Sequence, residues 1–382
     1  MEIIKSYKIR IFPTKGQEQK MWNHVGACRF IWNYMLEHQE ENYKNSGKHI
    51  SAFGMINLLK PLKNDGEHDW LYEVSNKSLQ RICQDLADSY NRFFKKIAKH
   101  PKFKSRKHSK VTYPVCLNNF YFKNEKCINI EKIGKIKYKT DFSFPFGRGV
   151  QKYNNVRVSY KDGKWFVSFG MKCESQTHDL KDANMGIDLG IKDLATVEFN
   201  GECLSFHNIN KSKQMRTLKK KLVHTQRSIS RKYEQNKQGN KFVKTNNITR
   251  EENKLHKIYA RITNIRNNYI HQTTHKLISM LPKCVIMEDL NVSGMMKNRH
   301  LSRAIGEMCF YELIRQMKYK CEWNGIEFVQ ADRFYPSSKT CSGCGCIKSD
   351  LKLSDRTYIC SECGLVIDRD YNAAVNLSRY VA

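Results

Sequence analysis

The chain of 382 residues carries 67 Lys or Arg against 37 Asp or Glu, a formal net charge of +30. Such a charge repels itself in a compact fold unless a polyanion neutralises it, and nucleic acid is the usual polyanion. An anionic membrane surface is the alternative partner, but the sequence has no apolar run long enough to span a bilayer. Because the N-terminal residues also lack the apolar core of a signal peptide, we expect a cytoplasmic protein.

In the N-terminal part, a helical segment interrupts a series of strands. Residues 3–12 alternate apolar and polar side chains as a strand does, and helical spacing of apolar residues extends from about 17 to 99. Residues 111–171 return to short strand patterns separated by Gly, Asn and Asp turns. The pattern predicts a β-rich module whose first strand is followed by an inserted helical segment.

The C-terminal part, from about residue 184, mixes strands with helices. It begins with MGIDLGIKDLATVEF, which predicts two strands joined by a tight turn. A long polar helical stretch follows, and then come the apolar strand KCVIMEDL, a helix near 304–323 and the strand IEFVQAD. A cysteine-rich segment separates this strand from a final helix.

Two segments concentrate the positive charge. Between residues 211 and 266, 17 Lys or Arg face 3 acidic residues, a local net charge of +14. A solvated helix face is the simpler interpretation, but the imbalance is too one-sided for i,i+4 ion pairs, so a phosphate-facing surface is favoured. Residues 93–110 place Phe93, Phe94 and Phe103 among further cations, where the rings either stack on bases or anchor the segment to a core. The candidate nucleic-acid contacts are Lys95, Lys96, Lys102, Lys104, Arg106, Lys107, Arg216, Lys219, Lys220, Arg227 and Arg231.

Four of the fourteen cysteines have the spacing of a zinc site. Cys341 and Cys344 form one Cys-x2-Cys pair, and Cys360 and Cys363 form a second pair after fifteen residues. Two such turns supply four thiolates to one tetrahedral ion, which predicts a closed, structural zinc ribbon rather than disulfides. Cys346 lies too close to Cys344 for a ligand turn, and the other nine cysteines are scattered without ligand spacing.

Three carboxylates stand at positions that suit metal chemistry. Asp188 lies within an apolar strand, where an uncompensated charge is costly. Glu288 follows the apolar run CVIM, and Asp370 precedes the final helix, where capping is the alternative explanation. An Asp on a first strand, a Glu on a later strand and an Asp on a final helix together resemble the arrangement by which RNase H-like nucleases hold two Mg²⁺ ions.

The residues around these sites resemble those of the TnpB family, the transposon-encoded relatives of type V CRISPR effectors. The resemblance is carried by DRFYPSSKTCSGCG at 332–345, CGLVIDRDYNAAVNL at 363–377 and MGIDLGIKDLATV at 185–197. Less specific matches extend it over essentially the whole chain, namely YKIRIFPTKGQEQKMWNHVGACRFIWNYML at 7–36, FFKKIAKHPKFKSRK, GKIKYK and GKWFVSF.

The resemblance implies an α+β multidomain fold. A wedge β-barrel at 1–14 and 111–180 would hold an inserted helical recognition domain at 15–110. An RNase H-like (RuvC) α/β nuclease domain at 181–330 and 366–382 would follow. It would contain the four-cysteine zinc ribbon, at 331–365, as an insert that binds the target nucleic acid.

The resemblance also implies a function, that of a Mg²⁺-dependent, RNA-guided DNA endonuclease of a transposable element. The partners would be a guide RNA from the transposon end and double-stranded target DNA, with one protein per RNA, at the nucleoid of a prokaryotic cell. Asp188, Glu288 and Asp370 would bind Mg²⁺ and be catalytic, whereas Asp289 and Asp368 receive no role. The alternatives are an RNA-independent transposase and a guided repressor that binds without cutting.

Overall fold

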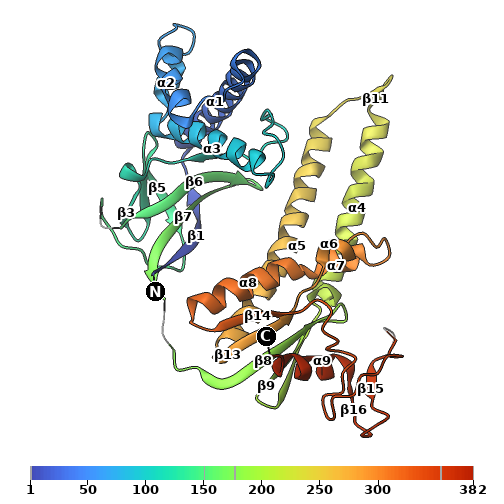
Figure 1. The fold of residues 1–382 in the computed structure, drawn as a ribbon. Helices are drawn as coiled ribbons and strands as arrows, with labels where there is room; N and C mark the ends of the chain where they lie inside the picture. Colours follow the sequence, from blue (N-terminus) through green and yellow to red (C-terminus); the bar gives the residue numbers. More distant parts are fainter. Residues whose placement is uncertain (1, 150, 176–177, 353–354, 382) are drawn as a thin grey trace. The chain divides into compact units, whose positions relative to one another are not determined.

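The computed structural model describes residues 2–149, 151–175, 178–352 and 355–381 (Figure 1). The chain forms two compact units, Met1–Glu174 and Ser175–Ala382, and each has its own hydrophobic core. Within the described ranges, no helix combines the length and the apolar character needed to cross a bilayer.

The described residues of the first unit form a seven-stranded sheet and three α-helices. The strands are β1 (Glu2–Phe12), β2 (Thr112–Pro114), β3 (Tyr121–Asn124), β4 (Cys127–Ile130), β5 (Gly134–Lys139), β6 (Tyr153–Lys161) and β7 (Lys164–Glu174). The helices are α1 (Lys15–Ser46), α2 (Ala52–Lys63) and α3 (Asn76–Phe94). β1 lies between β7 and β5 and pairs antiparallel with both, so the first strand of the chain is central in the sheet. The helices follow β1 directly, which confirms the inserted helical segment.

The strands of the first unit form a sheet with two free edges. Their order is β2-β6-β7-β1-β5-β4-β3, and the outer strands β2 and β3 do not pair with each other in the described residues. The barrel expected here is therefore open between β2 and β3 in its hydrogen bonding. Aromatic rings fill the interior, where the fully buried Phe122 stacks on Phe144 with ring centroids 4.5 Å apart.

Local capping signals explain where the three helices begin. Thr14 caps α1 through a full capping box, in which Gln17 Oε1 accepts from the Thr14 backbone N–H. Ser51 and Ser75 cap α2 and α3 by accepting backbone N–H groups of the first turn. The apolar faces of these helices share one core with the sheet.

The second unit is built on a five-stranded sheet of order β10-β9-β8-β13-β14. The strands are β8 (Lys181–Leu189), β9 (Asp193–Phe199), β10 (Glu202–His207), β13 (Pro282–Glu288) and β14 (Glu327–Ala331). The strands β8, β9 and β10 are antiparallel neighbours, whereas β8, β13 and β14 run parallel. The helices are α4 (Lys213–Gln235), α5 (Asn246–Ile278), α6 (Val292–Met295), α7 (Ser302–Met308), α8 (Phe310–Trp323) and α9 (Arg369–Ser378). Two small hairpins pair β11 (Lys237–Gln238) with β12 (Lys241–Phe242), and β15 (Thr357–Ile359) with β16 (Val366–Asp368).

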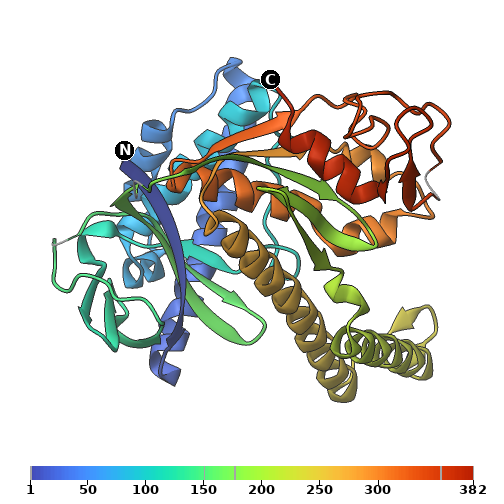
Figure 2. The ribbon, with the colours of Figure 1, turned by 90° about the horizontal axis from the view of Figure 1, so that it is seen from below.

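Strand alternation assigns the two faces of this sheet to different helices. Ile187 of β8 packs with residues of α5 and α8 in the main core, as Val285 and Met287 of β13 do. The intervening positions face the other side, where Ile286 packs with Leu377 of α9. The helix α9 therefore covers one face of the sheet, opposite to α5 and α8 (Figure 2).

The long polar helical stretch is a hairpin of two helices. The helices α4 and α5 lie side by side and project from the sheet as an arm, with β11 and β12 at its tip (Figure 1). A small core that includes Met215, Leu218 and Ile262 joins them. The helix expected near 304–323 is also divided, because Cys309 adopts a φ of 56° between α7 and α8.

Candidate active site and metal centre

Asp188 and Glu288 lie side by side on neighbouring parallel strands. The register pairs Ile187 of β8 with Met287 of β13, so the next residues of the two strands are neighbours as well. Both carboxylates follow the alternation onto the face that α9 covers. Each residue lies at or next to the C-terminal end of its strand. The two carboxylates therefore lie together at the C-terminal edge of the parallel part of the sheet.

Asp370 reaches this edge from the first turn of α9. The helix packs directly on β8 because Gly186 has no side chain. A Cβ at Gly186 would lie 2.0 Å from the Ala374 carbonyl oxygen and 2.4 Å from the Ser378 nitrogen. Gly186 precedes Asp188 by two residues and shares its face, so this glycine sets how close Asp370 comes to Asp188.

Burial and mutual repulsion disfavour the charged forms of Asp188 and Glu288. The pKa of Asp188 is raised well above its usual value, first by burial and then by the charges of Glu288 and Asp370. Protein atoms surround the Asp188 carboxylate on most sides, although some of the residue remains accessible to solvent. The pKa of Glu288 is also raised, mainly by burial. A bound cation would relieve this repulsion, so the cluster is typical of a metal site.

Ser337 holds the Glu288 carboxylate in place. Its Oγ donates to Glu288 Oε1 at 2.5 Å, and the Ser337 residue is 2% exposed. The Nδ2 of Asn376, on α9, donates to the Ser337 carbonyl at 2.7 Å and so fixes the serine backbone. Sequence reasoning did not single out Ser337, although it stands in the run PSSKTC just before the first cysteine pair.

Two arginines contact Asp370. Arg369 Nη2 lies 2.8 Å from Asp370 Oδ1, and Arg356 Nη1 lies 3.8 Å from Oδ2. These contacts partly balance one of the three negative charges. Arg356 immediately precedes β15, so the cysteine hairpin contributes a charge to this site. Neither arginine was singled out from the sequence. Arg356 is distant from Asp370 along the chain, and only the folded hairpin brings the two together.

The neighbouring carboxylates Asp289 and Asp368 have other partners. Asp289 pairs with Arg333 at 2.5 Å. Asp368 is the N-cap of α9 and accepts from the backbone N–H groups of Asp370 and Tyr371. Capping therefore explains Asp368 and leaves Asp370 without that role.

The three carboxylates offer the oxygen ligands that Mg²⁺ prefers. Among the described residues, the four cysteines form the cluster of His, Cys, Asp or Glu side chains that is close enough to share one metal ion, and the three carboxylates do not form such a cluster. Mg²⁺ keeps several waters and takes part of its coordination from substrate phosphates, which suits a wider site. The chemistry of the donor set therefore fits Mg²⁺.

The four predicted zinc cysteines converge on one point. Their sulfur atoms all lie within 4.8 Å of one another, and the Cys341–Cys363 and Cys344–Cys360 sulfur pairs are each 3.6 Å apart. Tetrahedral zinc with Zn–S bonds of ~2.3 Å needs sulfurs about 3.8 Å apart, which these distances approach. Cys346 stays outside the cluster, and its carbonyl accepts from the Cys341 backbone N–H. The cluster is thus a candidate zinc site with four thiolate ligands.

The cysteine hairpin and the helix that carries Asp370 share one hydrogen-bonded framework. Strand β16 ends at Asp368, the residue that caps α9. The buried amides of Asn372 and Asn376 on α9 both donate to the Thr340 carbonyl, beside the first cysteine.

The predicted nucleic-acid contacts of the second unit lie on α4. The exposed ones are Arg216, Lys220, Arg227 and Arg231. Three of them line a surface groove of about 980 Å³ along this helix, the exception being Arg216. Lys219 also lines the groove, but it pairs with Glu307 at 2.6 Å. Its charge therefore also stabilises the base of the arm.

The predicted contacts of the first unit follow α3. Lys95 and Lys96 stand directly after this helix, whereas Lys102, Lys104, Arg106 and Lys107 lie in the loop that leads to β2. Phe94 and Phe103 are 50% and 57% exposed, so neither ring is a core anchor.

Three family models match successive parts of the chain. A "Helix-turn-helix domain" of IS605 OrfB proteins matches residues 1–48, where this structure has one strand and one long helix. A "Probable transposase" model of the same proteins matches residues 168–299, which include Asp188 and Glu288. A "Cas12f1-like, TNB domain" matches residues 310–377, which include the four clustered cysteines and Asp370.

Relatives match nearly the whole chain. The "Putative RNA-guided DNA endonuclease" of Streptomyces pristinaespiralis is 30% identical over 376 residues, covering 98% of this chain and 89% of the relative. The "Putative RNA-guided DNA endonuclease InsQ" of Escherichia coli K12 is 30% identical over 394 residues, covering 99% and 92%. A cryo-EM structure of a Cas12f1–sgRNA–target DNA complex has the same fold, with a TM-score of 0.65 at 13% identity over 99% of both chains. The chain therefore belongs to the transposon-encoded TnpB (IS605 OrfB) family.

Proposed function

We propose that this protein is an RNA-guided DNA endonuclease that hydrolyses phosphodiester bonds at one active site, formed by Asp188, Glu288 and Asp370. The observation that carries the proposal is the meeting of these carboxylates at the edge of the sheet formed by β8 and β13, under α9. Membership of the TnpB family supports a guide RNA and a target DNA as partners. A double-strand break beside a short target motif is the proposed outcome.

Each residue of the site has a distinct task. Asp188, Glu288 and Asp370 hold divalent cations, with Mg²⁺ as the proposed ion. When bound, such ions supply an activated water and stabilise the leaving oxygen of the phosphodiester. Ser337 keeps one oxygen of Glu288 engaged, so that this carboxylate presents its other oxygen in a fixed direction. Arg369 balances the charge of Asp370 and must yield part of that contact when a cation binds.

The domain boundaries are part of the same proposal. The wedge domain comprises 1–14 and 111–180, and the recognition domain comprises 15–110, which contains α1, α2 and α3. The nuclease domain comprises 181–330 and 366–382, which contain the five-stranded sheet and α9. The zinc ribbon at 331–365 supports α9 through the Asn372 and Asn376 contacts.

The test is cleavage by the protein purified with the RNA that it retains. Asp188→Ala, Glu288→Gln and Asp370→Asn should each reduce Mg²⁺-dependent cleavage of a matched DNA duplex to background while preserving DNA binding. Asp289→Asn is the matched control, since Asp289 pairs with Arg333, and it should still cut. Cleavage by Asp188→Ala would show that the site is wrong, and cleavage by RNA-free wild type would favour a transposase instead.

A further inference from the structure

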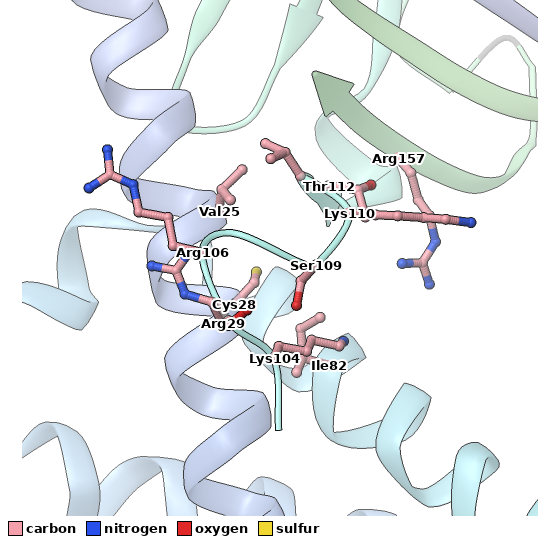
Figure 3. Close-up of a pocket in the computed structure, with 12 residues that line it drawn as sticks. Val25, Cys28, Arg29, Ile82, Lys104, Arg106, Ser109, Lys110, Thr112 and Arg157 are labelled. Carbon is pink, nitrogen blue, oxygen red and sulfur yellow. The ribbon is translucent and has the colours of Figure 1, made fainter. Parts of the chain in front are cut away.

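A pocket of about 310 Å³ lies in the first unit, apart from the carboxylate site. It is bounded by α1, α3, the loop before β2 and strand β6 (Figure 3). Its apolar wall is formed by Val25, Cys28, Ile82 and Val111. The described residues that line it include no carboxylate but five cations, namely Arg29, Lys104, Arg106, Lys110 and Arg157.

Most of these cations have no acidic partner. Asp85 pairs with Arg157 at 2.6 Å and is also shared with Arg81 at 3.2 Å. Arg29 and Arg106 extend together on one side of the loop, and neither forms an ion pair within the described residues (Figure 3). Like charges gathered in a concave site, with more cations than counter-ions, create a potential that attracts an anion.

Lys104 is held within the pocket by its neighbours. Its backbone N–H donates to Asn33 Oδ1 at 2.7 Å, and its carbonyl accepts from Asn33 Nδ2 at 3.0 Å. Its Nζ lies 3.2 Å from the ring centroid of Trp32. Burial lowers the pKa of Lys104 to about 8, so keeping this cation charged opposes folding. An anion bound to the folded protein would offset that cost.

The loop also provides what a nucleotide chain, rather than a free anion, would use. Phe103 directly precedes Lys104 and is 57% exposed, so its ring is available for a base to stack on. Ser105 and Ser109 line the pocket and offer hydroxyl donors to phosphate oxygens.

We propose that this pocket binds a backbone phosphate of a nucleic acid, with Arg29 and Arg106 on its oxygens and Lys104 supplying charge from the wall. The inference rests on the proposed function and adds an anchoring site in the first unit, distinct from the active-site carboxylates. Guide RNA and target DNA both carry phosphodiesters, so the experiment must separate them.

The test compares Arg29→Gln/Arg106→Gln with Lys20→Gln/Lys44→Gln, a control that removes two exposed charges from α1. Binding is measured for the RNA that copurifies with the protein, and for its matched DNA duplex on the protein–RNA complex, at several salt concentrations. The arginine pair should weaken one of these ligands about tenfold or more and lower its salt slope by about 1 relative to the control. The ligand whose slope falls is the one that the pocket holds.

Lys104→Met separates binding from folding. Removal of the buried charge should raise the Tm of the free protein and lower its affinity for the same ligand. If Lys104 had a purely structural role, its replacement would lower both the Tm and the affinity. If the arginine variant binds RNA and DNA with the slopes of the control, the pocket inference is wrong while the proposed function stands. If wild-type protein retains neither RNA nor matched DNA, the proposed function fails and the inference fails with it.

Discussion

At the scale of single residues, two carboxylates of the site, Asp188 and Glu288, oppose the stability of the metal-free fold. Asp188 and Glu288 have raised pKa values because burial and neighbouring charges disfavour their ionised forms. The folded protein therefore binds protons more readily than the unfolded chain does. The contribution of these groups to stability rises as the pH falls from the raised pKa towards the usual carboxyl pKa, and it is lowest above the raised pKa.

Asp188→Asn should therefore stabilise the protein while abolishing cleavage. In EDTA at pH 8 we expect its Tm to rise by about 2–4 °C, because one of the repelling charges is gone. Thermal melts at pH 5 and pH 8 measure this, and the gain should shrink at pH 5. Asp289→Asn, which breaks an ion pair with Arg333, should give no such gain. A lower Tm for Asp188→Asn at pH 8 would contradict the repulsion.

Gly186→Ala tests the close approach of α9 to β8. The added methyl would collide with the backbone of Ala374 and Ser378, so the helix must move away and carry Asp370 with it. We expect a loss of about 1–3 kcal/mol in stability and a large loss of cleavage. The control is Gly306→Ala on α7, whose Cβ would meet only ordinary contacts at 3.5 Å or more. Normal cleavage by Gly186→Ala would show that the spacing of Asp370 is not critical.

At the scale of elements, the ribbon and α9 form one assembly. The chain passes from Cys363 through β16 into α9, and Thr340 accepts two amide hydrogen bonds from that helix. The metal that joins the cysteine pairs would therefore also hold the helix that carries Asp370 in position.

Cys363→Ser should accordingly reduce cleavage before it reduces RNA binding. We expect loss of bound zinc, measured by mass spectrometry of the metal content, together with a strong loss of DNA cleavage and little change in RNA affinity. Cys203→Ser, at an exposed cysteine outside the sulfur cluster, is the matched control and should behave as wild type. Equal losses of cleavage and RNA binding would count against this role of the ribbon.

The elements also show what the sequence could predict. Alternation over residues 3–12 predicted β1, and the doubled Cys-x2-Cys spacing predicted the sulfur cluster, because each signal is local. The bond from Ser337 to Glu288 and the contact of Arg356 with Asp370 join distant segments, so no local pattern indicates them. The division of the 304–323 helix was missed because Cys309 is a residue type that rarely adopts positive φ. The Mg²⁺ ligands and the domain roles stay predictions.

At the scale of the whole molecule, the net charge of +30 includes two basic surfaces, the groove of α4 and the pocket beside α3. The exposed groove of α4 and the pocket beside α3 belong to different units, and the described residues that line them include several cations but no Asp or Glu. Affinity for nucleic acid should therefore be strongly salt-dependent, since each neutralised phosphate releases counter-ions.

A triple substitution in the groove of α4 tests this salt dependence quantitatively. Replacing Lys220, Arg227 and Arg231 together by Gln should lower the slope of log K against log salt for the bound nucleic acid by about 3. Lys219 is left intact because it pairs with Glu307 and supports the fold. The comparison uses the Lys20→Gln/Lys44→Gln variant at equal salt, and an unchanged slope would mean that the groove faces solvent in the complex.

The most direct test of the account is to redirect the cut by changing the guide. The protein is reconstituted with its copurifying RNA, whose target-pairing segment is replaced by a new sequence, and offered plasmids that carry the old or the new target in Mg²⁺. We predict a double-strand break only in the plasmid that matches the new guide, and none with the Asp188→Ala protein. Cleavage that ignores the guide sequence, or that persists in Asp188→Ala, would contradict the account.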